Sequence, residues 1–377
     1  MLLSDIKTNT AGVADNFLDI QKIYTQHVIK KITFLGCLAF LLVAMILVSV
    51  CVGTAFLTIG EVGQVIANKL ILSSPASFNS LADTVVMQLR LPRILLAIVT
   101  GISLAGAGAV MQGILRNPLV DPYTLGLSGG AAFGAALAIV LGTSILGPAF
   151  SVAGKYVIAA NAFIFGTITM ILVYGIAQIK GIAPETLVLG GVALGYLFAA
   201  GVSALKYLAA PEVLKDLVVW LMGGMWGASW DQVRLLFPLV LLCLAVLLRY
   251  SWDINTLVAG EEIAVSLGVK VNRLRLICLT ASTLAASATV AFTGIIGFIG
   301  LVAPHICRML IGNDHRFLIP SSCLLGAVLL LVADTLARTI MAPIEIPVGI
   351  ITSLIGAPFF MYLLVKRKRG WWTSSSR

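Results

Sequence analysis

Residues 93–115 have the sequence RILLAIVTGISLAGAGAVMQGIL, which carries no charge after its first arginine. At 1.5 Å per residue, a helix of this length crosses the roughly 30 Å hydrocarbon core of a bilayer. The whole 377-residue chain is 59% hydrophobic and only 11% charged, whereas a soluble domain carries about 25% charged residues. The composition therefore predicts one integral membrane domain, with no room for a separate soluble domain.

Further hydrophobic stretches of similar length follow one another along the chain. We predict spans at residues 32–57, 93–115, 124–141, 156–179, 187–208, 233–248, 276–295, 296–311, 317–341 and 347–365. The stretches 276–295 and 296–311 adjoin without a polar loop, so we expect one of them to be short or broken. The expected fold is all-α and polytopic, with about ten transmembrane helices.

The net charge of +9 would also suit a nucleic-acid partner, but its distribution indicates a membrane topology. If the N-terminus is cytoplasmic and the spans alternate, about two thirds of the 25 lysines and arginines fall on the inner side. This is the bias that the positive-inside rule describes. We therefore predict that both termini are cytoplasmic, and we expect no nucleic-acid partner.

Three regions divide the chain. Residues 1–31 form a polar N-terminal extension, residues 32–366 the transmembrane domain, and residues 367–377 a basic cytoplasmic tail. In the extension, apolar residues recur at helical spacing at Val13, Phe17, Ile20, Tyr24 and Val28. This pattern favours a helix on the inner membrane surface, with a disordered tail as the alternative.

Small residues mark one face of the predicted helix 93–115. Gly101, Ala105, Gly108 and Gln112 follow at spacings of three and four residues. Small side chains allow two helix backbones to approach closely inside a membrane, where burial in lipid gives no drive to associate. We expect this face to be a site of tight helix packing.

The sequence offers little chemistry of its own. It contains no GxxxxGK[ST] nucleotide motif and no HExxH or Cys/His metal cluster, so we expect no catalytic site, no metal site and no cofactor on this chain. Among its few intramembrane ionisable groups are Glu345 and Asp334, and we expect Asp334 to pair with Arg338 four residues later. A solute carrier without a nucleotide site or an ion relay needs a separate ATPase. A self-sufficient channel or secondary transporter and an intramembrane enzyme remain the alternatives.

Four motifs occur in a fixed order along the chain. They are LRLPR at 89–93, RNPLVDP at 116–122, GEEIAVSLG at 260–268, and GIIGFIGLVAPH at 294–305 followed by NDHR at 313–316. With EIPVG at 345–349 and GAP at 356–358, they resemble the FecCD-type permeases, the membrane subunits of iron-siderophore, haem and cobalamin ABC importers. The resemblance covers residues 32–368.

The resemblance implies the type II ABC importer permease architecture in a bacterial cytoplasmic membrane. Two permease subunits, as a homodimer or a heterodimer, would rest on two ATPase subunits, which hold ATP and magnesium. An extracytoplasmic substrate-binding protein would dock outside. The implied cargo is a ferric siderophore or a similar metal chelate, with haem or cobalamin as the alternative.

The resemblance also implies roles for particular residues. Docking of the binding protein falls to Arg90, Arg93 and Arg338, although arginines there would also suit interfacial anchors. The coupling element for the ATPase would be a short cytoplasmic helix pair within 252–275, and a solvated loop helix is the alternative. The residues assigned to coupling are Gly260, Glu261, Glu262, Ala264, Leu267 and Gly268. The cytoplasmic gate falls to Asn117, Leu119, Pro184, Glu185 and Thr186. Pro184 and Glu185 depart from the small hydroxyl residues of the cobalamin-type permease.

Overall fold

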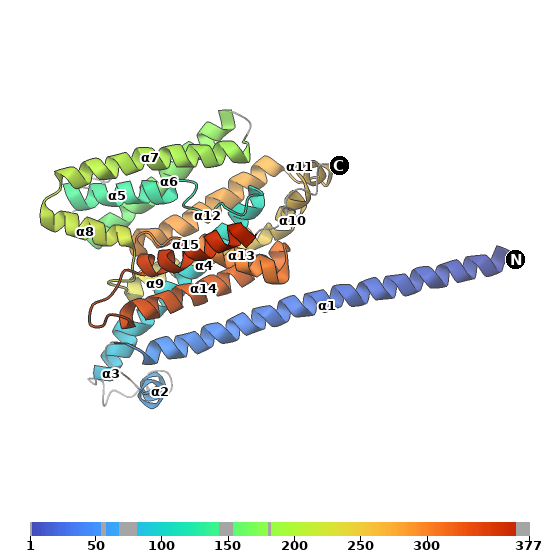
Figure 1. The fold of residues 1–377 in the computed structure, drawn as a ribbon, viewed down its shortest axis with the longest axis horizontal. Coiled ribbons are helices and arrows are strands. Elements are labelled where there is room, and N and C mark those ends of the chain that lie inside the picture. The colour runs from blue at the N-terminus through green and yellow to red at the C-terminus, as the bar shows by residue number, and fades with distance from the viewer. Residues whose placement is uncertain (1, 54–57, 68–80, 143–153, 180–181, 367–377) are drawn as a thin grey trace.

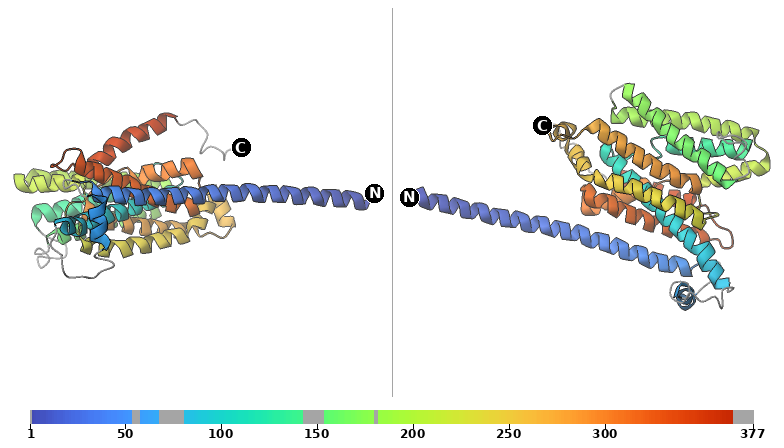
Figure 2. Two further views of the ribbon diagram at one scale, coloured as in Figure 1. Left: turned by 90° about the horizontal axis from the view of Figure 1, so that it is seen from below. Right: turned by 180° about the vertical axis from the view of Figure 1, so that it is seen from behind.

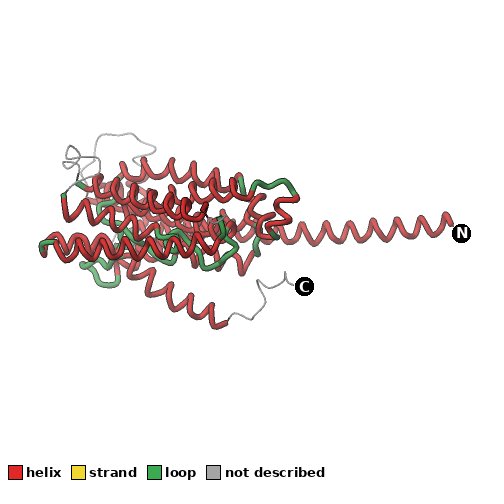
Figure 3. Tube along the Cα trace, turned by 90° about the horizontal axis from the view of Figure 1, so that it is seen from above, coloured by secondary structure: helices red, strands yellow, loops and turns green. Residues whose placement is uncertain are grey.

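The computed structural model describes residues 2–53, 58–67, 81–142, 154–179 and 182–366, and throughout these ranges the chain is helix and loop (Figure 3). The helices are α1 (Leu2–Cys51), α2 (Ile59–Ala67), α3 (Leu81–Thr84), the π-helix η2 (Val85–Arg90), α4 (Leu91–Ile114), α5 (Leu127–Leu141), α6 (Lys155–Ile179), α7 (Pro184–Leu208), α8 (Pro211–Met222), α9 (Trp230–Arg249), α10 (Ser251–Ala259), α11 (Glu261–Ser266), α12 (Val271–Thr293), α13 (Ile299–Ile311), α14 (His315–Thr339) and α15 (Val348–Lys366).

The ten predicted spans correspond to ten helices of the described chain. Seven are long and apolar enough to cross a membrane, and α5, α13 and α15 are shorter apolar helices. The predicted all-α polytopic fold is therefore confirmed. The second span begins earlier than predicted, because α3, η2 and α4 run on as one helical segment over Ala82–Ile114. Residues 54–57 of the first predicted span and the tail 367–377 lie outside the described residues.

Helix α1 is continuous from the extension into the first span. It leaves the bundle as one straight rod and projects far beyond the other helices (Figures 1 and 2). The extension therefore continues the direction of its own span.

Helix α4 lies at the centre of the bundle, where its small-residue face touches two other helices. A Cβ atom on Gly101 would lie 2.4 Å from the carbonyl oxygen of Gly326 in α14, and one on Gly108 would lie 2.0 Å from that of Gly300 in α13. The amide of Gln112 donates a hydrogen bond to the same Gly300 carbonyl, at 3.3 Å. The predicted packing face is thus confirmed, and α4 is in backbone contact with both neighbours.

The predicted break between the seventh and eighth spans is also present. The backbone leaves the helical path between α12 and α13, and Gly294 and Phe298 both have positive φ angles, +68° and +69°. A Cβ atom on Gly294 would lie 2.2 Å from the carbonyl oxygen of Trp220. Glycine is therefore required at this turn for both its conformation and its close approach.

Different short helices lie at the two ends of the bundle. The short helices α10 and α11 lie at the end from which α1 projects, and α2 and α3 lie at the opposite end (Figure 1). Helices α4 and α14 run antiparallel between these ends, with Arg93 and Arg338 near one end and Gly113 close to His315 near the other. We call the end with α2 and α3 the outer end and the end with α10 and α11 the inner end.

Candidate functional site

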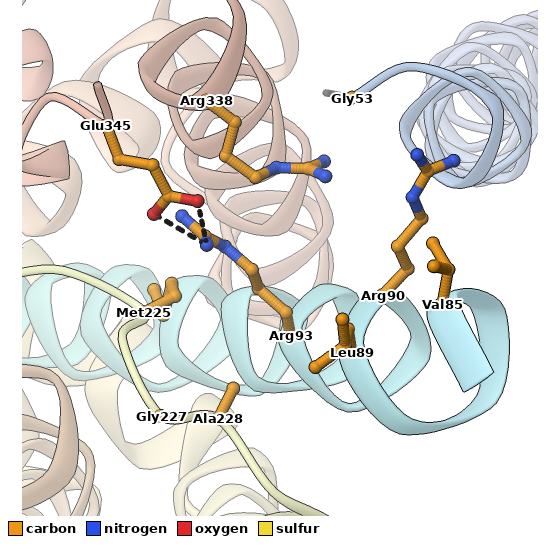
Figure 4. Close-up of a pocket in the computed structure, with 10 residues that line it drawn as sticks. All are labelled: Gly53, Val85, Leu89, Arg90, Arg93, Met225, Gly227, Ala228, Arg338 and Glu345. Atoms are coloured by element: carbon orange, nitrogen blue, oxygen red, sulfur yellow. Dashed lines mark hydrogen bonds and ion pairs between the residues drawn. The ribbon is translucent and has the colours of Figure 1, made fainter. Parts of the chain in front are cut away.

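The three predicted docking arginines meet in one cavity at the outer end. Arg90, Arg93 and Arg338 line a cavity of about 260 Å³ together with Gly53, Val85, Leu89, Met225, Gly227, Ala228 and Glu345. In Figure 4 the side chains of Arg93 and Arg338 come from neighbouring helices, and Arg90, the last residue of η2, extends toward the end of α1. The structure thus brings together three residues that are up to 248 positions apart in the sequence.

Arg93 is held by two carboxylates. Its Nε donates to both oxygens of Asp334 at 3.0 and 3.2 Å, and its Nη1 donates to both oxygens of Glu345 at 3.0 and 2.9 Å. Asp334 also pairs with Arg338, at 3.3 Å. The predicted pair Asp334–Arg338 is therefore confirmed, but it belongs to a larger cluster that includes Arg93 and Glu345.

Arg90 is the last residue of the π-helix η2. Its Nη1 donates a hydrogen bond to the carbonyl oxygen of Val50 and another, at 3.1 Å, to the carbonyl oxygen of Cys51. The guanidinium therefore caps the carboxyl end of α1. Arg338 also reaches this end, because its Nη2 donates to the Ser49 hydroxyl at 2.8 Å. π-Helical turns are rare and often mark functional sites; nothing in the sequence pattern predicted this one.

The cavity carries a positive charge. Three guanidinium groups face two carboxylates, those of Asp334 and Glu345. The side chain of Asp334 is 0% exposed and that of Glu345 is 32% exposed. Because guanidinium groups bind carboxylates in a planar, bidentate manner, this cavity can accept an acidic group from outside.

At the inner end, α10 and α11 form the predicted helix pair. Gly260 separates them with φ +153°, and Gly268 follows with φ +85°, so glycine sets the turn at each end of α11. Ile263, Val265 and Leu267 are large apolar residues on the exposed side of this segment, at 49, 60 and 67% exposure.

Ala264 occupies a different position from the one its predicted role requires. It is 0% exposed and packs against the permease itself, and its carbonyl accepts a hydrogen bond from the backbone N–H of Val269 at 2.9 Å. Glu262 is exposed on the opposite side. Glu262 and the three apolar residues are therefore exposed at the inner end, while Ala264 supports the segment from within.

Glu261 anchors α11 to the body of the permease. Its carboxylate accepts hydrogen bonds from Nη1 and Nη2 of Arg275 in α12, at 3.2 and 2.8 Å. The Arg275 side chain is only 3% exposed, and its Nη1 also donates to the carbonyl of Ile182 at 3.4 Å. Ile182 lies two residues before Pro184, the first residue of α7, so one buried guanidinium links α11, α12 and the segment that leads into α7.

The predicted gate residues lie in two neighbouring segments. In the loop after α4, the backbone N–H of Leu119 donates to the Asn117 side chain at 3.0 Å. Pro184, Glu185 and Thr186 form the first turn of α7. The loop and α7 are in contact at Gly191, which lies in α7 two turns after Pro184. A Cβ atom on Gly191 would lie 2.6 Å from the backbone of Leu125 in the loop.

Asp121 stabilises the same loop. Its carboxylate accepts hydrogen bonds from the backbone N–H groups of Tyr123 and Thr124, at 3.1 and 2.9 Å. Burial raises the pKa of Asp121 to about 6, although these hydrogen bonds act in the opposite direction. Buried charge is costly without a counter-ion, and this cost is the physical cause of the raised pKa.

A second polar cluster joins α1 to the inner end. The carboxylate of Asp314 accepts hydrogen bonds from Lys31 in α1 at 3.3 Å, from Asn255 in α10 at 2.9 Å and from Arg316 at 2.7 Å. These donors hold the pKa of Asp314 below its ordinary value, although partial burial raises it. The Arg316 guanidinium also stacks over the Trp252 ring, 4.0 Å from its centroid. Sequence reasoning quoted the motif at 313–316 but did not predict this contact.

These features define a multi-pass membrane permease with a basic cavity at one end and an exposed helix pair at the other. A model of the FecCD transport family matches residues 41–366. The chain belongs to the FecCD transport family, and it is a membrane-spanning permease subunit of an ABC importer.

Similar proteins cover almost the full chain. An ABC transporter permease protein of Methanocaldococcus jannaschii is 44% identical over 93% of this chain and 99% of its own length. The Fe(3+)-citrate import system permease of Bacillus subtilis is 39% identical over 87% of this chain and 94% of its own. A solved structure of a metal-chelate type ABC transporter in an inward-facing conformation matches with a TM-score of 0.76 at 37% identity, covering 89% of this chain and 99% of that one.

Proposed function

We propose that this permease imports a ferric siderophore or a similar ferric chelate that an extracytoplasmic binding protein delivers. The observation that carries the proposal is the gathering of three arginines in one outer cavity, at the opposite end from α10 and α11. The relative from Bacillus subtilis is named for ferric citrate, which supports a ferric chelate as cargo. Haem and cobalamin are the alternative cargoes, because permeases named for haemin and cobalamin are 41% and 44% identical.

Docking of the binding protein follows from the charge of the cavity. Arg90, Arg93 and Arg338 line one cavity, in which Arg90 and Arg338 are only 5% and 6% exposed. An acidic side chain on the binding protein gains charge-assisted hydrogen bonds there. Electrostatic complementarity of this kind sets orientation and on-rate more than raw affinity, which suits a partner that must dock and leave in each cycle.

Coupling to the ATPase follows from the exposed side of α11. Ile263, Val265 and Leu267 form an apolar surface next to Glu262. An apolar helix face beside a charged residue fits a groove on a soluble partner. In this proposal, ATP and magnesium bind to two ATPase subunits, and this chain itself binds no cofactor.

The assembly and topology complete the proposal. Two permease subunits, identical or related, enclose the path, and the inner end with α10, α11 and the N-terminal end of α1 faces the cytoplasm. The bias of lysine and arginine toward that side supports this orientation in the cytoplasmic membrane. Asn117, Leu119, Pro184, Glu185 and Thr186 border the inner end of the path.

Reconstituted transport tests the cargo. The permease–ATPase complex in proteoliposomes, with the cognate binding protein, is supplied in turn with radiolabelled ferric citrate, a ferric siderophore, haemin and cobalamin. We expect ATP-dependent uptake of a ferric chelate. Uptake of haemin or cobalamin alone would assign the alternative cargo, and uptake by the permease without ATPase subunits would establish a self-sufficient channel or secondary transporter.

Charge reversal tests the docking surface. We expect Arg90→Glu and Arg338→Glu to weaken binding of the binding protein to the nanodisc-embedded complex. Arg234→Glu is a matched control, because Arg234 lies near the outer end in the first turn of α9 and is 76% exposed in a pair with Asp231. If the two cavity variants bind as the control does at low salt, the docking assignment is wrong.

A further inference from the structure

The nitrogens of Arg93 are already occupied by carboxylates of the permease itself. Asp334 holds Nε and Nη2, with the closest contact to Nη2 at 3.0 Å, and Glu345 holds Nη1 with both of its oxygens. Figure 4 shows Glu345 reaching this guanidinium from the segment between α14 and α15. An acidic group from a docking partner therefore finds Arg93 satisfied, and it must compete for this side chain.

The two carboxylates are not equivalent as competitors. Asp334 is fully enclosed and is shared between Arg93 and Arg338, so its removal would leave two buried guanidinium groups poorly compensated. Glu345 is 32% exposed and lies on the rim of the cavity. An ion pair that water reaches is weak. Glu345 is thus the partner of Arg93 that an incoming carboxylate can replace.

We infer that Glu345 is an intramolecular competitor for docking: in the undocked permease it occupies the position at Arg93 that a carboxylate of the binding protein takes in the docked complex. The inference rests on the proposed docking function of the cavity. Docking then exchanges one carboxylate for another on Nη1, and Glu345 turns outward toward water.

This exchange has two physical consequences. Arg93 keeps a counter-ion both before and after docking, so the undocked permease does not expose an uncompensated guanidinium to other anions. The free energy gained at Arg93 is only the difference between two similar ion pairs, so the contact contributes little net affinity. Glu345 therefore lowers the affinity for any partner that offers a single carboxylate, and it favours a partner that engages Arg90 or Arg338 at the same time.

Neutralising Glu345 tests the inference. The probe is the purified, substrate-free cognate binding protein, and its affinity is measured on the nanodisc-embedded permease–ATPase complex by biolayer interferometry. We expect Glu345→Gln to bind the probe roughly two- to fivefold more tightly than the wild type at low salt. The matched control is Glu212→Gln, which removes the same charge from an exposed position in the first turn of α8.

A double-mutant cycle separates competition from a purely structural role. If Glu345 acts through Arg93, the gain from Glu345→Gln disappears in an Arg93→Ala background. Weaker or unchanged binding by Glu345→Gln, in a complex where Arg90→Glu and Arg338→Glu still abolish docking, would overturn the competitor role alone. If those two arginine variants dock normally, the docking function itself fails, and the competitor role fails with it.

Discussion

Removal of the Glu261 carboxylate tests how α11 is attached to the permease. In Glu261→Ala the guanidinium of Arg275 stays in place but loses two hydrogen bonds, of 2.8 and 3.2 Å. Its remaining contact is the long bond to Ile182 at 3.4 Å. Because the Arg275 side chain is 3% exposed, water cannot readily replace the lost partner.

The size of the effect lies between two limits. Breaking a fully buried ion pair by removing one partner costs about 3–5 kcal/mol, whereas an exposed pair contributes 0–1 kcal/mol. Arg275 is buried but Glu261 is 46% exposed, so screening by water reduces the cost. We expect a loss of about 1–2 kcal/mol of local stability, which loosens α11 without unfolding the bundle.

The measurement pairs stability with coupling. Thermal unfolding of the purified permease should be slightly lowered in Glu261→Ala, and ATP hydrolysis in the reconstituted complex should no longer follow substrate uptake. Glu212→Ala is the control, because it removes the same charge from an exposed position in the first turn of α8. If the two variants unfold and transport alike, the Glu261–Arg275 pair does not attach α11 and the reasoning is refuted.

Three further predictions follow from the placement of single residues. Leu267→Arg should abolish retention of the ATPase during purification while the permease stays folded, because Leu267 is 67% exposed. Ala264→Arg should instead unfold the inner end, since Ala264 is buried. Similar melting temperatures of the two variants would contradict this prediction. Gly108→Ala should lower the stability of the permease by about 1–3 kcal/mol, because the added Cβ overpacks against Gly300. The control in thermal unfolding is Gly175→Ala, where a Cβ meets open space. Equal melting temperatures of the two variants would refute the prediction. For Asp121, with a pKa raised to about 6, the native state takes up a proton between pH 7 and 5 that the unfolded chain does not yet bind. The wild type should therefore gain stability relative to Asp121→Asn as the pH falls through 6. If the difference in stability between the two proteins is constant between pH 7 and 5, the raised pKa of Asp121 is wrong.

Much of the fold could be predicted because lipid imposes simple rules on sequence. Uncharged stretches of span length gave the positions of the helices, and the spacing of Gly101, Ala105, Gly108 and Gln112 gave the packing face of α4. The break before α13 was visible because Gly294 begins a glycine-rich run at a point where two apolar stretches adjoin. Each of these signals is local in the sequence, and each reflects a constraint on one helix or one pair of helices.

The parts that sequence reasoning missed depend on contacts between distant segments. Arg93 and Glu345 are 252 residues apart, and nothing in either motif says that they meet. The coupling role of Ala264 was taken from the resemblance, and α11, a six-residue helix, is too short for its periodicity to define a buried face. The length of α1 was missed for another reason: Lys30 and Lys31 mark a change in polarity, but a change in polarity does not end a helix.

The long helices differ in how tightly they pack within the chain. Gly101 and Gly108 place the backbone of α4 against α14 and α13, and close-packed interfaces of this kind shift as rigid units rather than sliding gradually. Helix α7 differs, because only 17% of its apolar window is buried within the chain, against 83% for the segment that contains α4. Movement of α7 therefore disrupts fewer contacts within the subunit. Arg275 bonds both Glu261 in α11 and the carbonyl of Ile182 before α7, so one buried side chain connects the exposed helix α11 to the segment that leads into α7.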